Sequence, residues 1–257
     1  FETEKDKAAC GDFQPVALGV TGRTQVRNTL RTIDSQNVVA RLPGAGAPDE
    51  VVIYMAHWDH LGKDESLTGD QIYNGAADNA TGTAGLIELA RAFTLGEPPR
   101  RSVLFLAVTA EEQGLLGARA YIEDHLADQA SREKLAVYLN DDPGSGATLG
   151  FYMQGNQVAK TLFDAWLEPL RDLGVTRNII DGIGSTDHVP FDQIGLPAFN
   201  VIKDFDAYDE RTRHTNADFP ERMSEDELIQ SAIVMAHFAW QAAMLDGTIP
   251  RVPVSDR

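Results

Sequence analysis

The sequence predicts an α/β protein, a three-layer α/β/α sandwich built on a mostly parallel central sheet. Short runs rich in Val, Leu, Ile, Phe and Tyr, bounded by Gly, Pro or Asp, recur from residue 37 onward and are typical of buried strands. Segments with helical apolar spacing lie between these runs. Strands that alternate with helices favour a parallel sheet covered on both faces, so these two observations predict the fold class.

Six strands are predicted in order along the chain. Residues 43–48 (PGAGAP) separate the first two strands and predict a hairpin connection between them. Each candidate is four to six residues long, which is a usual strand length. The candidates are residues 38–42, 51–56, 103–108, 136–139, 149–153 and 198–202.

Three helices are predicted between and after these strands. An apolar stripe at i, i+3, i+4 and i+7 begins at Leu86 and indicates an amphipathic helix. Residues 158–173 have a second helical pattern. Residues 224–227 (SEDE) form a capping box, which predicts a final helix that runs to about residue 243.

Composition and length limit the domain organisation and the partners. No repeat or linker divides the 257 residues, so we expect an N-terminal arm, or the remnant of an upstream region, over residues 1–35 and one domain over residues 36–257. The net charge of −17 would repel phosphate backbones and argues against nucleic acid as a partner. The longest mostly apolar stretch, residues 232–245, is too short to span a bilayer, so we expect no membrane insertion.

Clusters of acidic and histidine residues follow several predicted strands. Residues 56–60 (AHWDH), 109–114 (TAEEQG) and 140–144 (NDDPG) come directly after three of them. Ligands of open α/β sheets bind at the carboxyl ends of strands, so a site is expected there. Residues 75–82 (GAADNATG) lead into the first predicted helix, and residues 213–218 (RHTNAD) precede the last one.

Each cluster alone also has an ordinary structural explanation. The His-x-Asp sequence at residues 57–59 can be a loop histidine beside an acid, and Asp78 can be a helix N-cap. The paired glutamates at residues 111–112 can be a solvated turn, and Asp-Pro-Gly at residues 142–144 is common turn chemistry. Residues 185–191 (STDHVPF) are a further polar loop with the same two explanations.

Taken together, the clusters indicate a metal site. They supply two histidines and three carboxylates, a ligand set that suits zinc, with cobalt or manganese as substitutes. Five ligands exceed what one tetrahedral zinc takes while it keeps a water, and a carboxylate that bridges two metals would account for the surplus. One of the two adjacent glutamates can bind metal while its neighbour serves as a base.

The ordered motifs AHWDH, GAADNATG, AEEQGLLGA, NDD and RHTNAD resemble those of the di-zinc aminopeptidase family. That family includes the secreted bacterial leucyl aminopeptidases and is related to glutamate carboxypeptidase, the transferrin receptor ectodomain and glutaminyl cyclase. The resemblance covers about residues 37–245 and keeps the family's motif order. It implies the zinc peptidase, phosphorylase/hydrolase-like version of the predicted fold and a hydrolytic reaction.

The resemblance assigns a role to each candidate ligand. Asp78 matches the carboxylate that bridges two Zn²⁺ ions. His57 and Asp142 match the other ligands of one zinc, and Glu112 and His214 match those of the second. All five positions carry a residue type that can bind zinc, which implies two Zn²⁺ ions as cofactors.

The resemblance also assigns roles to residues beside the ligands. Glu111 matches the general base, and Asp59 matches the residue that orients His57. Asp187 and His188 match the family's Ser/Thr-Asp-His loop next to the site and are expected to support it without binding metal.

Two positions depart from the family pattern. Asp141 stands where the family usually has an apolar residue, and the Asn140-x-Asp142 spacing favours Asp142 over Asp141 as the ligand. Arg213 precedes the last histidine, where the family often has Tyr or His, so no aromatic hydroxyl is expected at that position.

The implied activity is that of an aminopeptidase, in which a metal-bridged water attacks peptides that have a free N-terminus. Alternatives on the same fold are glutaminyl cyclase-like activity with one zinc, carboxypeptidase or dipeptidase activity, and a non-catalytic binding homologue. Substrate choice is expected in loops 60–74, 143–157 and 203–213. Many relatives are exported, so the resemblance implies a secreted or periplasmic location.

Overall fold

The computed structural model divides into two compact units, Phe1–Asp34 and Ser35–Arg257. The second unit carries every strand and helix named below. Parts of the predicted N-terminal arm lie outside the described residues, and its boundary with the domain stays a prediction. The structure describes residues 7–8, 11, 13–15, 17, 19–28, 30, 32–143, 145–204 and 206–253, without the side chains of residues 206 and 207.

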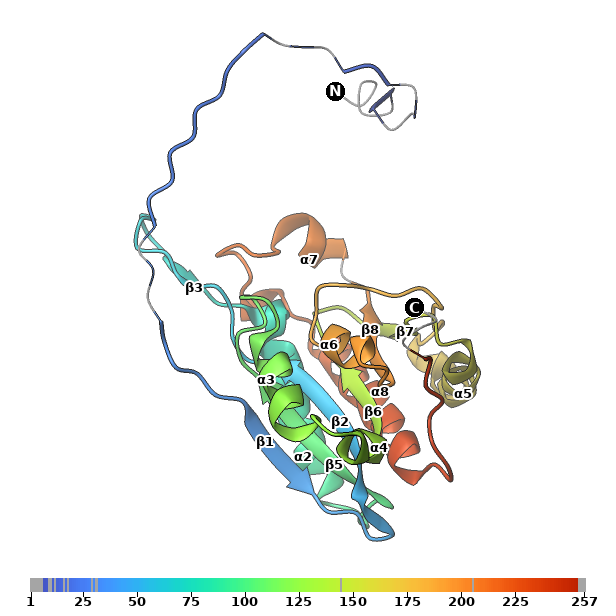
Figure 1. Ribbon diagram of the computed structural model, residues 1–257. Helices are drawn as coiled ribbons and strands as arrows, with labels where there is room; N and C mark the ends of the chain where they lie inside the picture. Colours follow the sequence, from blue (N-terminus) through green and yellow to red (C-terminus); the bar gives the residue numbers. More distant parts are fainter. Residues whose placement is uncertain are drawn as a thin grey trace. The chain divides into compact units, whose positions relative to one another are not determined.

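A six-stranded sheet forms the centre of the second unit, in the order β1-β5-β2-β6-β8-β7 (Figure 1). Strands β5, β2, β6 and β8 run parallel, whereas β1 and β7 pair antiparallel at the two edges. The predicted mostly parallel sheet is therefore confirmed. The strands are β1 Val38–Leu42, β2 Ala47–His57, β5 Arg101–Val108, β6 Leu135–Asn140, β7 Thr148–Tyr152 and β8 Ala198–Lys203, and β3 Gly62–Lys63 and β4 Ile72–Tyr73 form a separate pair.

The predicted hairpin between the first two strands is wrong, because β5 lies between β1 and β2 in the sheet. Residues 43–48 cross the beginning of β5, and the backbone N–H of Ala45 donates to the Pro99 carbonyl at 2.8 Å. Gly44 permits this approach, since a Cβ there would lie 2.4 Å from the Arg100 carbonyl oxygen. The Gly- and Pro-rich segment therefore passes over the beginning of β5 to connect β1 with β2, and does not form a tight turn.

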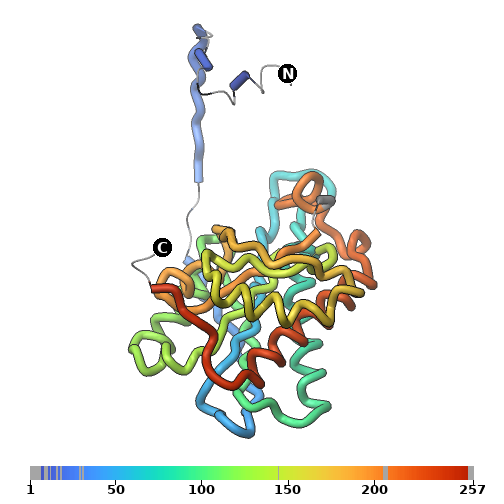
Figure 2. Tube along the Cα trace, turned by 90° about the vertical axis from the view of Figure 1, so that its right-hand side faces the viewer, coloured from blue at the N-terminus to red at the C-terminus, as the bar shows by residue number. Residues whose placement is uncertain are grey.

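Helices cover both faces of the sheet and complete three layers (Figure 1). Side chains alternate along β2, so Val52 and Tyr54 enter one core cluster while Ile53 and Met55 enter the other. The first cluster packs on α2, α5 and α8, of which α2 and α8 lie side by side (Figure 2), and the second packs on α3 and α6. These helices are α2 Thr81–Phe93, α5 Gln157–Leu167, α8 Glu225–Met244, α3 Leu116–His125 and α6 His188–Gln193.

The three predicted helices are present, with one shortened. The α-helix α5 ends at Leu167 and continues as the 3₁₀ segment η2. Ser224 caps α8 as predicted, because its Oγ accepts the N–H of Glu227 at 3.4 Å. Short elements that were not predicted are η1 Ala76–Ala80, α4 Gln129–Lys134, α7 Asp206–Arg211 and η3 Pro220–Arg222; η2 spans Glu168–Leu173. None of the helices in the described part of the chain has the length and apolar character needed to cross a membrane.

Candidate metal centre

The carboxyl ends of β5, β2 and β6 bring the predicted site residues to one edge of the sheet. His57 is the last residue of β2, Glu111 and Glu112 follow β5, and Asp142 follows β6. The three strands are parallel neighbours, so these side chains meet where the strands end. The position agrees with the site expected from the sequence.

One cluster joins His57, Asp78 and Asp142, all of which are buried. His57 Nε2 lies 3.0 Å from Asp78 Oδ1 and 3.3 Å from Asp142 Oδ1. Asp78 does not cap the helix that follows it, because the N-cap of α2 is Ala80 and no side chain caps that end. The N-cap explanation of Asp78 is therefore excluded, and its carboxylate is free to face His57.

A second cluster forms on the other side of Asp78. His214 Nε2 lies 3.2 Å from Asp78 Oδ2 and 3.2 Å from Glu112 Oε2. The two oxygens of Asp78 thus face different histidines, His57 through Oδ1 and His214 through Oδ2. This is the arrangement that a bridging carboxylate requires. All five predicted ligands lie in these two clusters.

His60 joins the second cluster and had no role in the sequence prediction. Its Nδ1 lies 2.8 Å from Glu112 Oε1, and potential ligand atoms of His60, Asp78 and Glu112 lie within 4.8 Å of one another. Its ring centroid lies 6.0 Å from that of His214. The signal was present in the motif AHWDH, whose second histidine comes three residues after His57.

The donor atoms fit a zinc ion. Ligand atoms 2.0–2.1 Å from a tetrahedral zinc lie about 3.4 Å apart, close to the separations of 3.0 to 3.3 Å between His57 Nε2 and its two carboxylates. Burial alone would lower the pKa of His57, but Asp142 and Asp78 outweigh it and raise that pKa. The site therefore has an excess of negative charge, which a divalent cation would offset.

Glu111 lies in a cavity of about 440 Å³ together with Glu112, Asp142 and His214. Burial, followed by the negative charge of Asp142, raises the pKa of Glu111 to about 9. Two of the three loops in which substrate choice was expected line this cavity: loop 143–157 through Pro143, and loop 203–213 through Tyr208, Asp209 and Arg213. Among the described residues, none of loop 60–74 lines it. A carboxylate with a raised pKa beside a cluster of ligands has the character of a general base.

Asp59 contacts its neighbours differently from the expected pattern. His57 Nδ1 lies 3.1 Å from the backbone carbonyl of Asp59 and 3.8 Å from its carboxylate Oδ1. The carboxylate instead accepts the backbone N–H groups of Glu111 at 3.1 Å and Glu112 at 3.3 Å. Asp59 thus orients His57 through its main chain and fixes the turn of both glutamates through its side chain.

Asp141 points away from the two clusters. Its Oδ1 lies 3.0 Å from Lys203 Nζ, and its Oδ2 accepts the hydroxyl of Tyr54 at 2.9 Å. The neighbouring Asp142 faces His57, so the geometry agrees with the choice of Asp142 over Asp141 as the candidate ligand.

The loop of Asp187 and His188 reaches the site through Thr186. The Thr186 hydroxyl donates to Asp142 Oδ2 and accepts from Asn140 Nδ2 at 2.7 Å. Asp187 and His188 are fully buried and stay outside both clusters, where burial raises the pKa of Asp187 to about 8 and lowers that of His188 to about 4. Thr186 belongs to the Ser/Thr-Asp-His motif but was given no role in the sequence prediction, because its contact with Asp142 is a long-range one.

Two further residues that the sequence did not single out hold Asp78. The Tyr208 hydroxyl donates to Asp78 Oδ2 at 2.6 Å, and the Asp218 carboxylate accepts the backbone N–H groups of Ala77 at 2.8 Å and Asp78 at 3.2 Å. Asp218 is the last residue of the motif RHTNAD, whereas Tyr208 lies in α7, outside every motif. Arg213 does not supply a hydroxyl beside the site, but Tyr208 does.

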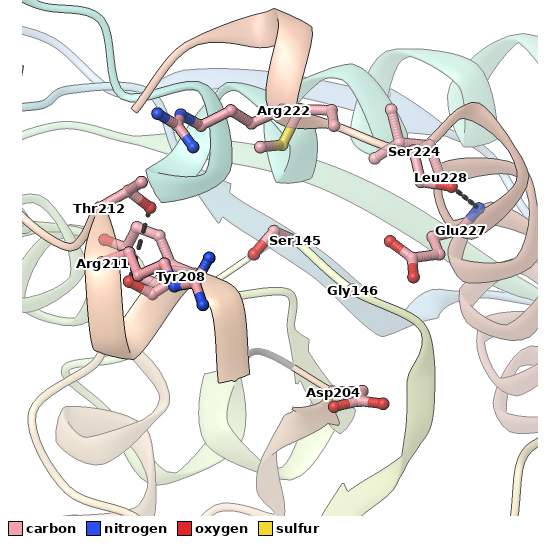
Figure 3. A pocket seen from close by; sticks show the side chains of 11 residues that line it. Ser145, Gly146, Asp204, Tyr208, Arg211, Thr212, Arg222, Ser224, Glu227 and Leu228 are labelled. Carbon is pink, nitrogen blue, oxygen red and sulfur yellow. Dashed lines mark hydrogen bonds between the residues drawn. The ribbon is translucent and has the colours of Figure 1, made fainter. Parts of the chain in front are cut away.

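Tyr208 lines both the cavity that contains Glu111 and a second cavity of about 300 Å³. Figure 3 shows Arg211 and Arg222 on one side of this second cavity and Glu227, from the first turn of α8, on another side. The two cavities therefore share the Tyr208 side chain, whose hydroxyl contacts Asp78.

The sheet order and the cluster of histidines and carboxylates at its carboxyl edge define an α/β protein with a candidate metal centre. The chain belongs to Peptidase family M28, whose sequence model matches residues 37–239. Mouse carboxypeptidase Q is 29% identical over 224 residues, which cover 87% of this chain and 45% of the relative. Leupeptin-inactivating enzyme 1 of Streptomyces exfoliatus is 29% identical over 202 residues, with coverages of 76% and 42%. The chain thus spans less than half the length of these two relatives.

Solved structures confirm the predicted fold. A peptidase M28 precursor from Shewanella amazonensis has a TM-score of 0.71 at 26% identity, covering 84% of this chain and 47% of that one. A zinc aminopeptidase from Bacillus subtilis has a TM-score of 0.64 at 24% identity, with coverages of 86% and 52%. A glutaminyl cyclase from an Acidobacteriales bacterium also scores 0.64 at 19% identity, with coverages of 80% and 73%. The last two similarities concern the fold alone.

Proposed function

We propose that this chain is a zinc-dependent exopeptidase that removes N-terminal residues from peptides. The observation that carries the proposal is the position of Asp78, whose two carboxylate oxygens face His57 and His214 on opposite sides. Membership in Peptidase family M28 supports a peptidase, and a zinc aminopeptidase from Bacillus subtilis shares the fold.

The proposal includes two zinc ions, with Co²⁺ or Mn²⁺ as substitutes, and the set of two histidines and three carboxylates supports it. His57 and Asp142 would hold one ion and Glu112 and His214 the other, with Asp78 between them. Zinc bound there would polarise the scissile carbonyl and lower the pKa of the attacking water. His60 would act on Glu112 through the oxygen that does not face His214, and so orient it.

Glu111 performs the proton transfers in this proposal. Its carboxylate takes a proton from the attacking water and then passes it to the nitrogen of the leaving amine. Burial and the charge of Asp142 raise the pKa of Glu111 to about 9, so the metal-free protein holds it protonated at neutral pH. Bound cations would lower this pKa and favour the carboxylate that a general base requires. Asp59 keeps Glu111 and Glu112 in fixed orientations, because its carboxylate binds both backbone N–H groups.

A carboxypeptidase or dipeptidase is the second candidate, and one observation favours it. Arg119 and Arg213 line the same cavity as Glu111 and His214. A guanidinium group binds a carboxylate well, so these arginines could hold the C-terminus of a short peptide. Mouse carboxypeptidase Q is among the relatives. Glutaminyl cyclase-like or non-catalytic roles have less support, because every predicted ligand position of both clusters holds a metal-binding side chain.

Peptides blocked at one end distinguish the candidates. We expect an aminoacyl peptide with a free amino terminus to be cleaved, its N-acetyl counterpart to be nearly inert and its C-terminal amide to be cleaved. The acetyl group removes the charge of the amine and ties up its lone pair next to the acidic cluster. If the acetylated peptide is cleaved as fast as the free peptide and the amide is not cleaved, the enzyme is a carboxypeptidase and the aminopeptidase proposal is wrong.

Two properties of the whole chain are also part of the proposal. We place a single catalytic domain at residues 36–257 and an arm at residues 1–35; the family match over residues 37–239 lies within the former. A secreted or periplasmic location is proposed from the resemblance to exported peptidases. Limited proteolysis tests the boundary, and fractionation of the native source tests the location.

A further inference from the structure

Lys203 is a buried cation that the proposed reaction does not use. It is the last residue of β8, and its side chain has no solvent exposure. Its Nζ lies 3.0 Å from Asp141 Oδ1 and donates a hydrogen bond of 2.7 Å to Ser231 Oγ. Asp141 Oδ1 accepts no hydrogen bond among the described residues, so its contact with Lys203 is mainly electrostatic.

Asp141 is held at several atoms beside the candidate metal centre. The Tyr54 hydroxyl donates to Asp141 Oδ2 at 2.9 Å, and Asn79 Nδ2 donates to the Asp141 carbonyl at 2.7 Å. The backbone N–H of Asp141 donates to the Met55 carbonyl at 3.0 Å. Since Asn79 follows Asp78 in the chain, the position of Asp141 is tied to the bridging carboxylate as well as to Asp142.

Two adjacent aspartates, Asp141 and Asp142, directly follow β6, and either could supply the metal ligand beside His57. Asp142 faces His57 in the candidate metal centre, whereas the neighbouring Asp141 faces Lys203. On one side Lys203 offers a positive charge, and on the other side His57 and Thr186 contact Asp142. Without Lys203, the Asp141 carboxylate would be buried without a counter-charge, a costly state. Turning towards the metal centre would relieve that cost and displace Asp142.

We propose that Lys203 is a positioning residue which, by pairing with Asp141, selects Asp142 as the metal ligand. The inference rests on the metal centre of the proposed function. It explains why an acid is tolerated at position 141, where the resemblance leads us to expect an apolar residue. Lys203 acts through Asp141 and touches neither metal nor substrate.

The two partners of the ion pair are predicted to respond differently to substitution. Lys203→Met leaves the competing carboxylate in place, so we expect the zinc affinity of one of the two sites to fall by about 10- to 100-fold, as for lost supporting contacts of metal ligands. Asp141→Asn removes the competing charge, and we expect zinc affinity within about twofold of the unmodified protein. Both variants leave a buried charge without its counter-charge, so the melting temperature should fall in both. A purely structural ion pair would instead make the two variants equally harmful to zinc binding.

The double variant and a control complete the test. Asp141→Leu with Lys203→Met removes the competition and the buried charges together, so zinc affinity should return. Lys160→Met breaks the more exposed ion pair with Asp164 in α5 and should leave zinc affinity unchanged. Lys203→Gln, which can still donate to Ser231, replaces Lys203→Met if that variant does not fold.

Zinc affinity is measured on the full chain by competition with a chromophoric chelator, and stability by thermal unfolding of the metal-free protein. Loss of zinc affinity in the lysine variant alone, with recovery in the double variant, supports the proposal. Equal affinities of the lysine variant and the unmodified protein, or no recovery in the double variant, would overturn it. Absence of zinc binding by the unmodified protein would instead refute the proposed function.

Discussion

Asp78 occupies the centre of the site because its contacts hold it on every side. His57 and His214 face its two oxygens, while Tyr208 and Asp218 fix its side chain and its backbone N–H. Burial alone would raise the pKa of Asp78, but contact with His57 outweighs it and lowers that pKa below the usual range. The carboxylate is therefore ionised at neutral pH, as its proposed bridging role requires.

Glu111 and Glu112 are adjacent but are predicted to have different tasks. Glu111→Gln should lower kcat by about two to four orders of magnitude with little change in bound metal, because it removes only the proton acceptor. Glu112→Gln should instead lower metal occupancy, since Glu112 Oε2 faces His214. The measurements are steady-state kinetics and metal analysis of the two isosteric variants. Equal metal loss and equal kinetic defects would contradict these roles.

Glu111 and Asp187 predict a pH dependence for the metal-free protein. Burial is the main cause that raises their pKa values, to about 9 and about 8. Between the unfolded pKa near 4 and these values, the folded state binds more protons than the unfolded state, so stability falls as pH rises. Denaturant unfolding without metal should show this decrease between about pH 5 and pH 8. The double variant Glu111→Gln with Asp187→Asn should make the free energy of unfolding depend less on pH. An unchanged pH dependence would show that these two carboxyl groups do not cause it.

The sequence singled out the five candidate ligands because each belongs to a motif of several residues. His60 and Asp218 lie in the same motifs but were not assigned, since their roles follow from contacts with Glu112 and with the backbone around Asp78. Tyr208 had no motif signal, because it reaches Asp78 from another element 130 residues away in sequence. Long-range contacts of this kind are not encoded in local spacing.

At the scale of secondary structure, the candidate site lies where strands β2, β5 and β6 end. Apolar β-branched and aromatic runs predicted the six strands of the central sheet closely, and both faces of the four parallel strands are covered, whereas β1 at the edge is mostly exposed. The pairing of β1 with β5 could not be read from the chain, because it depends on contacts between residues more than 60 positions apart. Short helices such as α6 were not predicted, since six residues give too little periodicity.

The cap of α8 predicts a stability effect without an effect on chemistry. Ser224 Oγ accepts the N–H of Glu227, and α8 packs on α2 and on the sheet. Ser224→Ala should lower the free energy of unfolding by about 1 kcal/mol, measured by denaturant unfolding. Ser224→Asp preserves an acceptor and serves as the control. Loss of metal binding in the alanine variant would show that α8 also affects the metal centre.

At the scale of the whole molecule, a strongly acidic chain concentrates carboxylates at one edge of a sheet. The net charge of −17 acts weakly at long range because salt screens it, so the local cluster determines what binds. Two histidines, three carboxylates and the neighbouring Glu111 converge from five segments of the chain. Two arginines, Arg119 and Arg213, line the cavity that contains Glu111. Divalent cations at the cluster would complete the charge balance of this arrangement.

Zinc stoichiometry combined with activity tests the central claim most directly. Metal-free protein is titrated with Zn²⁺ while bound metal and aminopeptidase activity are followed together. The account predicts saturation at two equivalents, loss of activity on chelation, and a His57→Ala variant that loses one site more than the other while remaining folded. Saturation at one equivalent with full activity would contradict the bridging role of Asp78 and the two-metal centre.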